Sequence, residues 1–412
     1  MYKKVLFLTL LLALVLAACA PAVDRPEGDI TSDPQTDSQV DTNTLPEEIA
    51  QAGGTEPPEN MGVPPRDAMS EFPLTDFSQH SISYNDILSG GPPRDGIPPI
   101  DQPVFISIAE ADEWLRPLEP VIQLAVNEEV RAYPIQILTW HEIVNDTVGG
   151  LPVVVTFCPL CNTAIAFERT VGDQALTFGT TGRLRFSNLI MYDRQTETWW
   201  QQATGEGIVG EFTGVQLTFV PAAMVSWEAF KAANPEGEVL SRETGFTRSY
   251  GRNPYVGYDD VNRPPFLYQG PQTPGALPPV ARVLALEFDG ESVAYPYDLL
   301  SEVAVINDRV GELEVAIFWA PGTASALDES VIAEGQDVGA AVAYDRNLSG
   351  QVLSFKSDGE QIVDIETGST WNILGRAVDG PLSGEQLTEV VSVNHFWFSW
   401  AAFKPETRIY QP

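Results

Sequence analysis

Short apolar or alternating runs recur along the chain after residue 120, and each is bounded by Gly, Pro or Asn-Asp. This pattern is typical of β-strands. In its first part it predicts strands at 124–126, 130–133, 153–157, 164–167 and 175–178, with a hairpin turn at 170–174. Helical spacing of apolar residues predicts short helices at 135–144 and 226–233. The pattern therefore predicts an α+β fold that is rich in strands.

The same pattern occurs twice along the chain. Three blocks align in the same order: 132–153 with 294–315 (ten identities in twenty-two positions), 164–178 with 341–355 (six in fifteen), and 226–231 with 399–404. Self-similarity of this kind indicates a repeated structural unit. We therefore expect an internal duplication, with a first copy at 76–252 and a second, degenerate copy at 281–412. A Pro-rich connector with several aromatic residues, 253–280, joins them and is expected to be ordered.

The second copy lacks the reactive residues of the first. The alignment pairs Cys158 with Ala320, Cys161 with Thr323 and His141 with Val303. The copies also differ in length nearby: the second has fifteen extra residues after Thr323, and the first has six extra residues within 179–192. Residues that both copies share are most simply structural. We therefore expect the first copy to hold the functional site and the second to support it.

Charge narrows the choice of partners. The chain has 23 Lys plus Arg against 57 Asp plus Glu, a formal net charge of -34. Because nucleic-acid binding needs clustered cations that neutralise phosphates, this balance excludes nucleic acid as a partner. Three cysteines, Cys19, Cys158 and Cys161, are too few for a disulfide scaffold.

The N-terminus accounts for the first cysteine. Lys3 and Lys4 precede an apolar run at 5–15, and Leu16-Ala-Ala-Cys19 follows. This layout is that of an export signal, and it resembles a bacterial lipoprotein signal peptide at 1–18. The resemblance implies lipidation of Cys19, attachment to the membrane through that lipid, and an exported protein at the surface of the cell envelope. The alternative is an uncleaved anchor with an incidental cysteine.

Residues 19–75 have the composition of a disordered acidic linker. From residue 20 to 71 there is no aromatic residue, and Pro, Thr, Asp and Gly dominate. Such a segment cannot bury enough apolar surface to offset its ordering entropy. The folded part is expected to begin near Phe72.

Several motifs of the first copy resemble one known family. They are Tyr133-Pro134, Trp140-His-Glu-Ile-Val-Asn-Asp146, Phe157-Cys-Pro-Leu-Cys161 and Ser187-Asn-Leu-Ile-Met-Tyr-Asp-Arg194, together with Asp95-Gly-Ile-Pro-Pro and the segment 254–258. The chain is similar over about residues 77–412 to the domain-of-unknown-function family 3179. The resemblance implies no established activity, so the chemistry has to come from the residues.

Cys158-Pro-Leu-Cys161 places two sulfurs on one tight loop. Two thiolates can hold copper or zinc, with the imidazole of His141 as a third ligand. The same spacing also suits a thiol–disulfide oxidoreductase, in which one thiolate attacks and the other resolves. Since strands rather than a helix are expected after Cys161, we favour a metal-binding knuckle. An inert disulfide in a metal-free scaffold or receptor is the third alternative.

Other residues are candidates for the wall of a pocket around these ligands. Glu142 or a backbone carbonyl is expected to orient His141 by accepting a hydrogen bond from its imidazole. The others lie in the stretch where the copies differ in length: Arg183, Arg185, Asn188 and Met191. The arginines could bind an anionic group or form a solvated hairpin face, and Met191 could be a thioether ligand for copper. His80 and His395 are interpreted as structural. We expect metal handling or redox chemistry at the cell surface, and the sequence identifies no protein partner.

Overall fold

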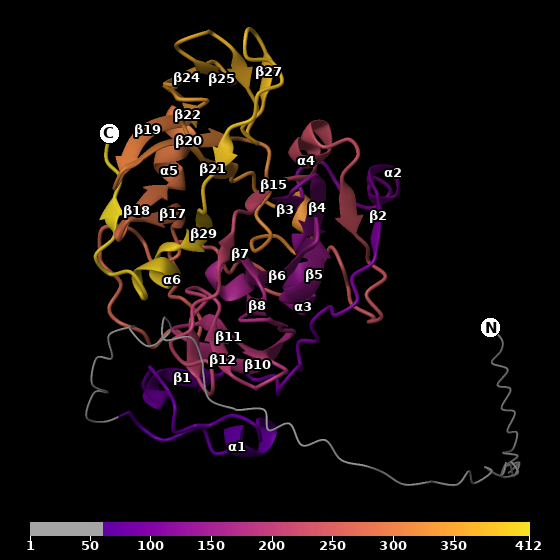
Figure 1. Ribbon diagram of the computed structural model, residues 1–412, viewed down its shortest axis with the longest axis vertical. Coiled ribbons are helices and arrows are strands. Elements are labelled where there is room, and N and C mark those ends of the chain that lie inside the picture. Colours follow the sequence, from indigo (N-terminus) through magenta and orange to yellow (C-terminus); the bar gives the residue numbers. More distant parts are fainter. Residues whose placement is uncertain (1–60) are drawn as a thin grey trace, which may run out of the picture. The chain divides into compact units, whose positions relative to one another are not determined.

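The computed structural model describes residues 61–412 (Figure 1). The lipoprotein signal expected at 1–18, the lipidation site Cys19 and the linker up to residue 60 lie outside the described residues. Within 61–412, no helix is both long and apolar enough to span a membrane. Residues 61–75, which were expected to be linker, include helix α1 (Ala68–Glu71), and both Ala68 and Phe72 are fully buried.

Strands dominate the fold, as the sequence pattern predicts, and the sheets are largely antiparallel. The longer helices each follow directly on a strand. The helices are α1, α2 (Ile108–Ala111), α3 (Ile135–His141), α4 (Trp227–Ala233), α5 (Tyr297–Val303) and α6 (Trp397–Ala401), with short 3-10 helices η2 (Tyr84–Asp86), η3 (Pro159–Cys161) and η4 (Ile332–Glu334).

Three sheets and a small hairpin form the first half. One sheet has the order β15-β3-β4-β16-β2, from β15 (Ala223–Ser226), β3 (Pro120–Val126), β4 (Glu129–Pro134), β16 (Glu238–Leu240) and β2 (Phe105–Ser107). A second has the order β14-β7-β6-β5, from β14 (Phe219–Val220), β7 (Thr163–Glu168), β6 (Leu151–Cys158) and β5 (Ile143–Val148). A third has the order β1-β10-β11-β12-β13, from β1 (Ile87–Ser89), β10 (Phe178–Arg185), β11 (Asn188–Asp193), β12 (Trp199–Gln201) and β13 (Gly207–Val209). The hairpin is β8 (Thr170–Val171) with β9 (Gln174–Ala175).

The second half contains sheets of closely corresponding strand order. The first is β29-β17-β18-β30, from β29 (Val393–Phe396), β17 (Arg282–Phe288), β18 (Glu291–Pro296) and β30 (Arg408–Ile409). The second is β19-β20-β21-β28, from β19 (Val305–Val310), β20 (Leu313–Ala320), β21 (Ala340–Asp345) and β28 (Thr388–Glu389). The third is β24-β25-β26-β27, from β24 (Phe355–Asp358), β25 (Gln361–Asp364), β26 (Thr370–Trp371) and β27 (Ala377–Asp379), and the hairpin is β22 (Asn347–Leu348) with β23 (Gln351–Val352).

The helix predicted at 135–144 ends earlier than its apolar spacing indicates. Glu142 adopts a left-handed conformation with φ of 58°, which stops α3 at His141. Ile143 then begins β5, which pairs with β6 so that Ile143 lies opposite Thr156. The apolar residues of this stretch therefore belong first to a helix and then to a strand. Apolar spacing could not separate the two, because a buried strand and a buried helix have the same local pattern.

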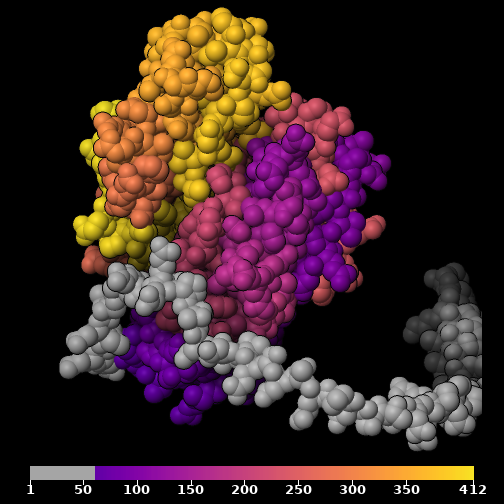
Figure 2. Space-filling model, in the orientation of Figure 1, coloured from indigo at the N-terminus to yellow at the C-terminus, as the bar shows by residue number. Residues whose placement is uncertain are grey.

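One hydrophobic core extends across both halves. It contains β6, which is buried from Val153 to Cys158, together with Phe396 and Phe398 of the second half. Strand β7 contacts β29, and β15 contacts β21. Figure 2 shows the two halves meeting where the magenta atoms give way to yellow. Tyr255 and Tyr258 of the connector pack against this same core.

Candidate functional site

Two free cysteines lie at the end of β6, on a segment that we call the dithiol turn (158–161). Cys158 is the last residue of β6, and Pro159 begins the 3-10 helix that ends at Cys161. Asn162, left-handed with φ of 50°, reverses the chain so that Thr163 of β7 pairs with Cys158. Proline suits this first position because its φ is fixed and its missing N–H would have no partner there. The exposed fractions of Cys158 and Cys161 are 2% and 0%, so neither thiol is open to solvent.

Polar groups surround the two sulfurs. The carbonyl oxygen of Ser187 lies 3.8 Å from Cys158 Sγ and 3.4 Å from Cys161 Sγ and accepts from both thiols. The amide Nδ2 of Asn188 donates to Cys161 Sγ at 3.4 Å, and the backbone N–H of Leu189 donates to the sulfur of Cys158. Donors of this kind stabilise a thiolate, whereas the Ser187 carbonyl suits a protonated thiol. The surroundings therefore accommodate sulfur in either protonation state.

Burial and the neighbouring thiol both oppose ionisation of Cys158. Its pKa lies well above the usual range, first because the side chain is desolvated and next because of the neighbouring Cys161. The charge of Glu142 raises this pKa further. At neutral pH the Cys158 thiol is therefore protonated, and a binding partner that displaces its proton has to supply compensating positive charge.

The Ser187 carbonyl is held in place by an unusual hairpin turn between β10 and β11. Phe186 and Ser187 are both left-handed, with φ of 53° and 64°. Two-residue hairpins of this geometry normally use Asn and Gly, and other residues there cost about 1 kcal/mol or more each. The Ser187 hydroxyl donates to the carbonyl of Phe266 in the connector, which ties the turn down. This turn lies within 179–192, where the internal alignment of the sequence indicates six extra residues.

Asn188 is fixed by a network of fully buried amides. Its Oδ1 accepts from Gln201 Nε2 at 2.6 Å and from the backbone N–H of Ala203 at 2.9 Å. Its Nδ2 also donates to Gln202 Oε1 at 2.8 Å, and Gln202 in turn donates to Thr156 Oγ1 at 3.0 Å. Such a connected network leaves the amide next to Cys161 little freedom to rotate.

Glu142 is a buried carboxyl group close to the dithiol turn. It follows α3, and its carbonyl accepts from the backbone N–H of Phe157, the residue before Cys158. Burial raises its pKa to about 8. Burial also raises the pKa of Tyr255 in the connector, and the charges of Glu142 and Cys158 raise it further. Glu142 was a candidate wall residue, and the structure places it within electrostatic reach of Cys158.

The connector covers the dithiol turn. The hydroxyl of Tyr258 donates to the carbonyl of Leu160, between the two cysteines, at 2.9 Å. It also accepts from the backbone N–H of Phe266 at 3.4 Å. Burial raises the pKa of Tyr258, and the charge of Cys161 adds to that effect. The connector therefore shields the thiols from solvent and is bonded to the turn itself.

His141 is fully buried but has other partners than the thiols. Its Nδ1 donates to the carbonyl of Pro98 at 2.7 Å, so a backbone carbonyl orients the ring, one of the two arrangements expected. Its Nε2 lies 2.6 Å from the hydroxyl of Tyr250, from which it accepts. Burial lowers the pKa of His141. Within residues 61–412, no group of three His, Cys, Asp or Glu side chains is arranged to hold a metal ion, so His141, Cys158 and Cys161 do not form a three-ligand group in this structure.

The remaining candidate wall residues have separate environments. Arg183 forms ion pairs with Asp67 at 3.0 Å and Glu71 at 2.8 Å, and thereby ties residues near α1 to β10. Met191 is fully buried in the core that also contains the two cysteines. Arg185 lines a different cavity, described below. Of the residues singled out in 183–191, Asn188 is thus the one whose side chain contacts a thiol.

His395 contacts the dithiol turn from the second half, although its sequence context gave no sign of this. Its Nδ1 lies 2.7 Å from Thr163 Oγ1, whose hydroxyl also bonds the carbonyl of Cys161 at 3.1 Å. Its Nε2 is buried and has no hydrogen-bond partner in the described part of the chain. Burial lowers the pKa of His395 to about 3, so the ring is neutral. One usable signal was the aromatic run Phe396-Trp-Phe398 directly after His395, which favours burial of this segment.

The motifs around the dithiol turn match a known protein family. No curated protein and no solved structure matches this chain. A family model described as Protein of unknown function (DUF3179) matches residues 94–407, which include the dithiol turn, the connector and most of the second half. The resemblance drawn from the sequence motifs is thereby confirmed. The chain belongs to the DUF3179 family.

Proposed function

We propose that this protein binds a soft metal ion, copper or zinc, through the sulfurs of Cys158 and Cys161, with Cu(I) preferred. The observation that carries the proposal is that both thiols are free, adjacent and directed at one carbonyl, with an N–H donor for each sulfur. Thiolates are the ligands that select Cu(I). Zinc needs about four ligands, whereas Cu(I) is satisfied by two sulfurs. The pair of thiols thus favours Cu(I) unless further ligands move in.

Metal binding would supply the charge that the buried dithiol lacks. The raised pKa of Cys158 means that a bare thiolate is unfavourable there. A bound cation removes that penalty, and the thiol protons are released as the sulfur–metal bonds form. Affinity should therefore increase with pH. The N–H groups of Asn188 and Leu189 would orient the sulfurs, as outer hydrogen bonds commonly do in metal sites.

A competition titration with a coloured Cu(I) chelator under anaerobic conditions tests the proposal. The Cys19→Ala chain leaves Cys158 and Cys161 as the remaining cysteines. We expect one equivalent of Cu(I) to bind and to be lost in Cys158→Ser and in Cys161→Ser. Thr323→Ser, at the position that the alignment pairs with Cys161, is the matched control and should bind as the parent does. Retained stoichiometric binding in both cysteine variants would exclude this site.

A second candidate function is thiol–disulfide exchange, favoured by two free thiols that approach the same carbonyl oxygen, that of Ser187. One cysteine, as thiolate, would attack a substrate disulfide and expel one substrate thiol. The other cysteine would then attack the mixed disulfide, leaving a Cys158–Cys161 disulfide and a substrate reduced to two thiols. Alkylation of the free thiols after equilibration in glutathione buffers measures what fraction of Cys158 and Cys161 is oxidised to the disulfide. A pair that oxidises reversibly in a protein unable to bind Cu(I) would favour exchange over metal binding.

We also infer that the folded region arose by duplication, with copies at 76–252 and 281–412 and a connector at 253–280. The corresponding strand orders of the two halves support this. So does the left-handed residue that ends each equivalent helix, Glu142 after α3 and Ala304 after α5, both with φ of 58°. On this reading the first copy keeps the thiols, and the second is the degenerate copy that packs against them.

We further propose that the protein is exported and anchored at the cell envelope through lipidated Cys19. The support is the Leu-Ala-Ala-Cys box that follows a short basic and apolar segment. Replacement by Cys19→Ala should leave the protein unprocessed or soluble instead of membrane-associated. Detergent partitioning of the two forms measures this, and equal partitioning would contradict it.

A further inference from the structure

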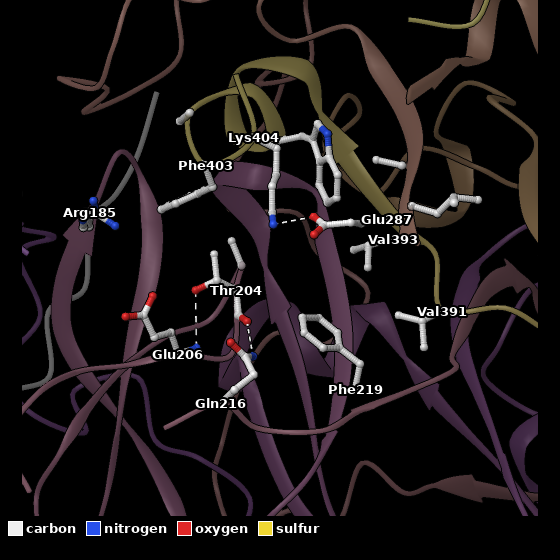
Figure 3. A pocket seen from close by; sticks show the side chains of 15 residues that line it. Arg185, Thr204, Glu206, Gln216, Phe219, Glu287, Val391, Val393, Phe403 and Lys404 are labelled. Carbon is white, nitrogen blue, oxygen red and sulfur yellow. Dashed lines mark hydrogen bonds and ion pairs between the residues drawn. The ribbon is translucent and has the colours of Figure 1, made fainter. Parts of the chain in front are cut away.

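A cavity of about 620 Å³ lies between the two halves of the chain, apart from the dithiol turn. Its size is within the range of pockets that bind small molecules. One wall comes from β10, β14 and the loop 203–206, and the other comes from β17 and the segment 391–404. Figure 3 shows Arg185 and Glu206 together on one side of this cavity and Val391 and Val393 on the other.

Arg185 brings a guanidinium group to the wall of this cavity. Its side chain is 19% exposed and is packed 4.5 Å from the ring of Phe186 and 5.5 Å from that of Phe403. Its Nε is buried and forms an ion pair with Asp86 at 3.6 Å, which is too long for a hydrogen bond, so this atom has no hydrogen-bond partner among residues 61–412. A guanidinium carries five N–H donors, and leaving them without partners is unfavourable. A carboxylate in the cavity would satisfy them.

Glu206 supplies the opposite charge next to Arg185. One of its oxygens accepts from the Ser81 hydroxyl at 3.0 Å. The two side chains form no ion pair within the described residues, although both line the cavity. Burial lowers the pKa of Arg185, and the charges of Asp86 and Glu206 oppose this shift. Space therefore remains between a cation and an anion that each have bonding capacity left. By contrast, Lys404 and Glu287 are paired with each other.

The rest of the cavity wall is largely apolar. It includes Phe219, Val391, Val393 and Trp400, of which Val393 and Trp400 are buried. A charged end next to an apolar body is a common design for sites that bind small amphipathic molecules. A purely anionic ligand would meet the carboxylate of Glu206, whereas a zwitterion would match both charges at once.

We propose that this cavity binds a zwitterionic α-amino acid with an apolar side chain. Arg185 takes the carboxylate, Glu206 takes the ammonium group, and the side chain lies against the apolar wall. This proposal is independent of metal binding at the dithiol turn, because none of its residues contacts a sulfur. The six extra residues of the first copy build the part of the hairpin that carries Arg185, which the second copy lacks.

Calorimetric titration of the full chain with L-phenylalanine tests the proposal. The matched probes are 3-phenylpropionate, which lacks the ammonium group, and phenethylamine, which lacks the carboxylate. We expect saturable binding of phenylalanine at one site, at least about tenfold tighter than either probe, because each probe lacks the charged group that would pair with one of the two side chains. Arg185→Gln should weaken phenylalanine binding by about tenfold or more and leave phenethylamine binding unchanged.

Two further variants make the test decisive. Arg309→Gln removes one positive charge from an exposed position in β19 and should bind phenylalanine as the parent does. Val391→Trp fills the cavity without altering Arg185 and should abolish binding, which covers the case in which Arg185→Gln does not fold. The proposal is overturned if no heat of binding appears up to about 10 mM phenylalanine, well beyond the range of specific ligands. It is also overturned if either probe binds as tightly as phenylalanine, or if Val391→Trp binds normally.

Discussion

The imidazole of His395 is hydrogen-bonded to the side chain of Thr163, with 2.7 Å between Nδ1 and Oγ1. This bond joins the second half of the chain to the residue two positions after Cys161. Since the Thr163 hydroxyl donates to the Cys161 carbonyl, Nδ1 of His395 is the donor and the ring is neutral. The dithiol turn is therefore fixed by contacts that both halves provide.

Stability at acid pH should depend on His395. Its pKa is about 3 in the folded protein and about 6.5 when exposed. Between these values the unfolded chain binds a proton that the folded chain does not, so the stabilisation present above pH 6.5 is lost as the pH falls towards 3. We expect the free energy of unfolding to fall by about 1.4 kcal/mol per pH unit from this group.

Urea unfolding between pH 4 and 7.5 measures this effect. His395→Gln keeps a polar group beside Thr163 but does not titrate, so its stability should fall less steeply with acid. His80→Gln, at a half-buried histidine, is the control and should follow the parent. Identical slopes for the parent and His395→Gln would rule out a titrating His395.

Stability at alkaline pH should depend on Glu389, at the end of β28. Burial raises its pKa to about 8, and its Oε1 is buried with no hydrogen-bond partner in the described chain. Because the folded pKa is raised above the usual 4.5, the stabilisation is complete below pH 4.5 and is lost as the pH rises through 8. Between pH 5 and 8, Glu389→Gln should lose less free energy of unfolding than the parent, by about 1.4 kcal/mol per pH unit, and above pH 8 the difference should level off.

Chemical denaturation at pH 5, 7 and 9 gives the comparison. Glu385→Gln, an exposed residue four positions earlier, is a matched control and should behave as the parent does. Parallel curves for the parent and Glu389→Gln would show that this carboxyl ionises normally in the folded state.

The hydroxyl of Tyr258 should control access to the thiols. Its bond to the Leu160 carbonyl holds the connector over the dithiol turn. Tyr258→Phe removes a hydrogen bond of about 1 kcal/mol and leaves a buried carbonyl without a partner. In the Cys19→Ala chain we expect the thiols to react with an aromatic disulfide reagent about fivefold faster or more.

Tyr268→Phe is the matched control for this measurement. The hydroxyl of Tyr268 bonds to Pro271 within the connector itself and does not contact the turn. The thiols of the Tyr268→Phe variant should react at the same rate as those of the parent. Equal acceleration in both variants would mean that general loosening of the connector, and not the Leu160 contact, exposes the sulfurs.

Phe72 should make a large contribution to stability, although it precedes the expected start of the first copy. It is fully buried, with its ring centroid 5.2 Å from that of Tyr192 and 5.3 Å from that of Trp199. Removal of such a side chain costs about 3–5 kcal/mol. Phe72→Ala should lower the urea midpoint accordingly, whereas Phe246→Ala, at a more exposed ring, should not. A Phe72→Ala protein with unchanged stability would favour a linker that reaches residue 75.

Much of the strand layout could be predicted because the sequence encodes it locally. The alternation at 130–133 and the apolar run at 153–157 lie within β4 and β6, and a turn follows Phe157 where Cys-Pro-Leu-Cys indicated one. The end of α3 could not be predicted, because Glu142 is an ordinary helix former that adopts a left-handed conformation only in its tertiary context.

The surroundings of the thiols could be predicted only in part. Asn188 was a candidate because it lies where the two copies differ, and it does contact Cys161. The partner of His141 is the carbonyl of Pro98, which no side-chain pattern reveals, since every residue has a carbonyl. His395 lies 232 positions after Thr163 in the sequence, and only the packing of β29 on β7 brings the two residues together.

The core that contains Cys158 and Cys161 also contains Val393, Phe396 and Phe398 from the far end of the chain. A fragment that stops at the connector would expose this apolar surface to water and would lose the contact between His395 and Thr163. If the duplication that we propose holds, the repeated unit is shorter than the part of the chain that has to fold together. The dithiol turn cannot be excised as an autonomous module, and the shortest chain able to hold it as described extends from the first copy into α6.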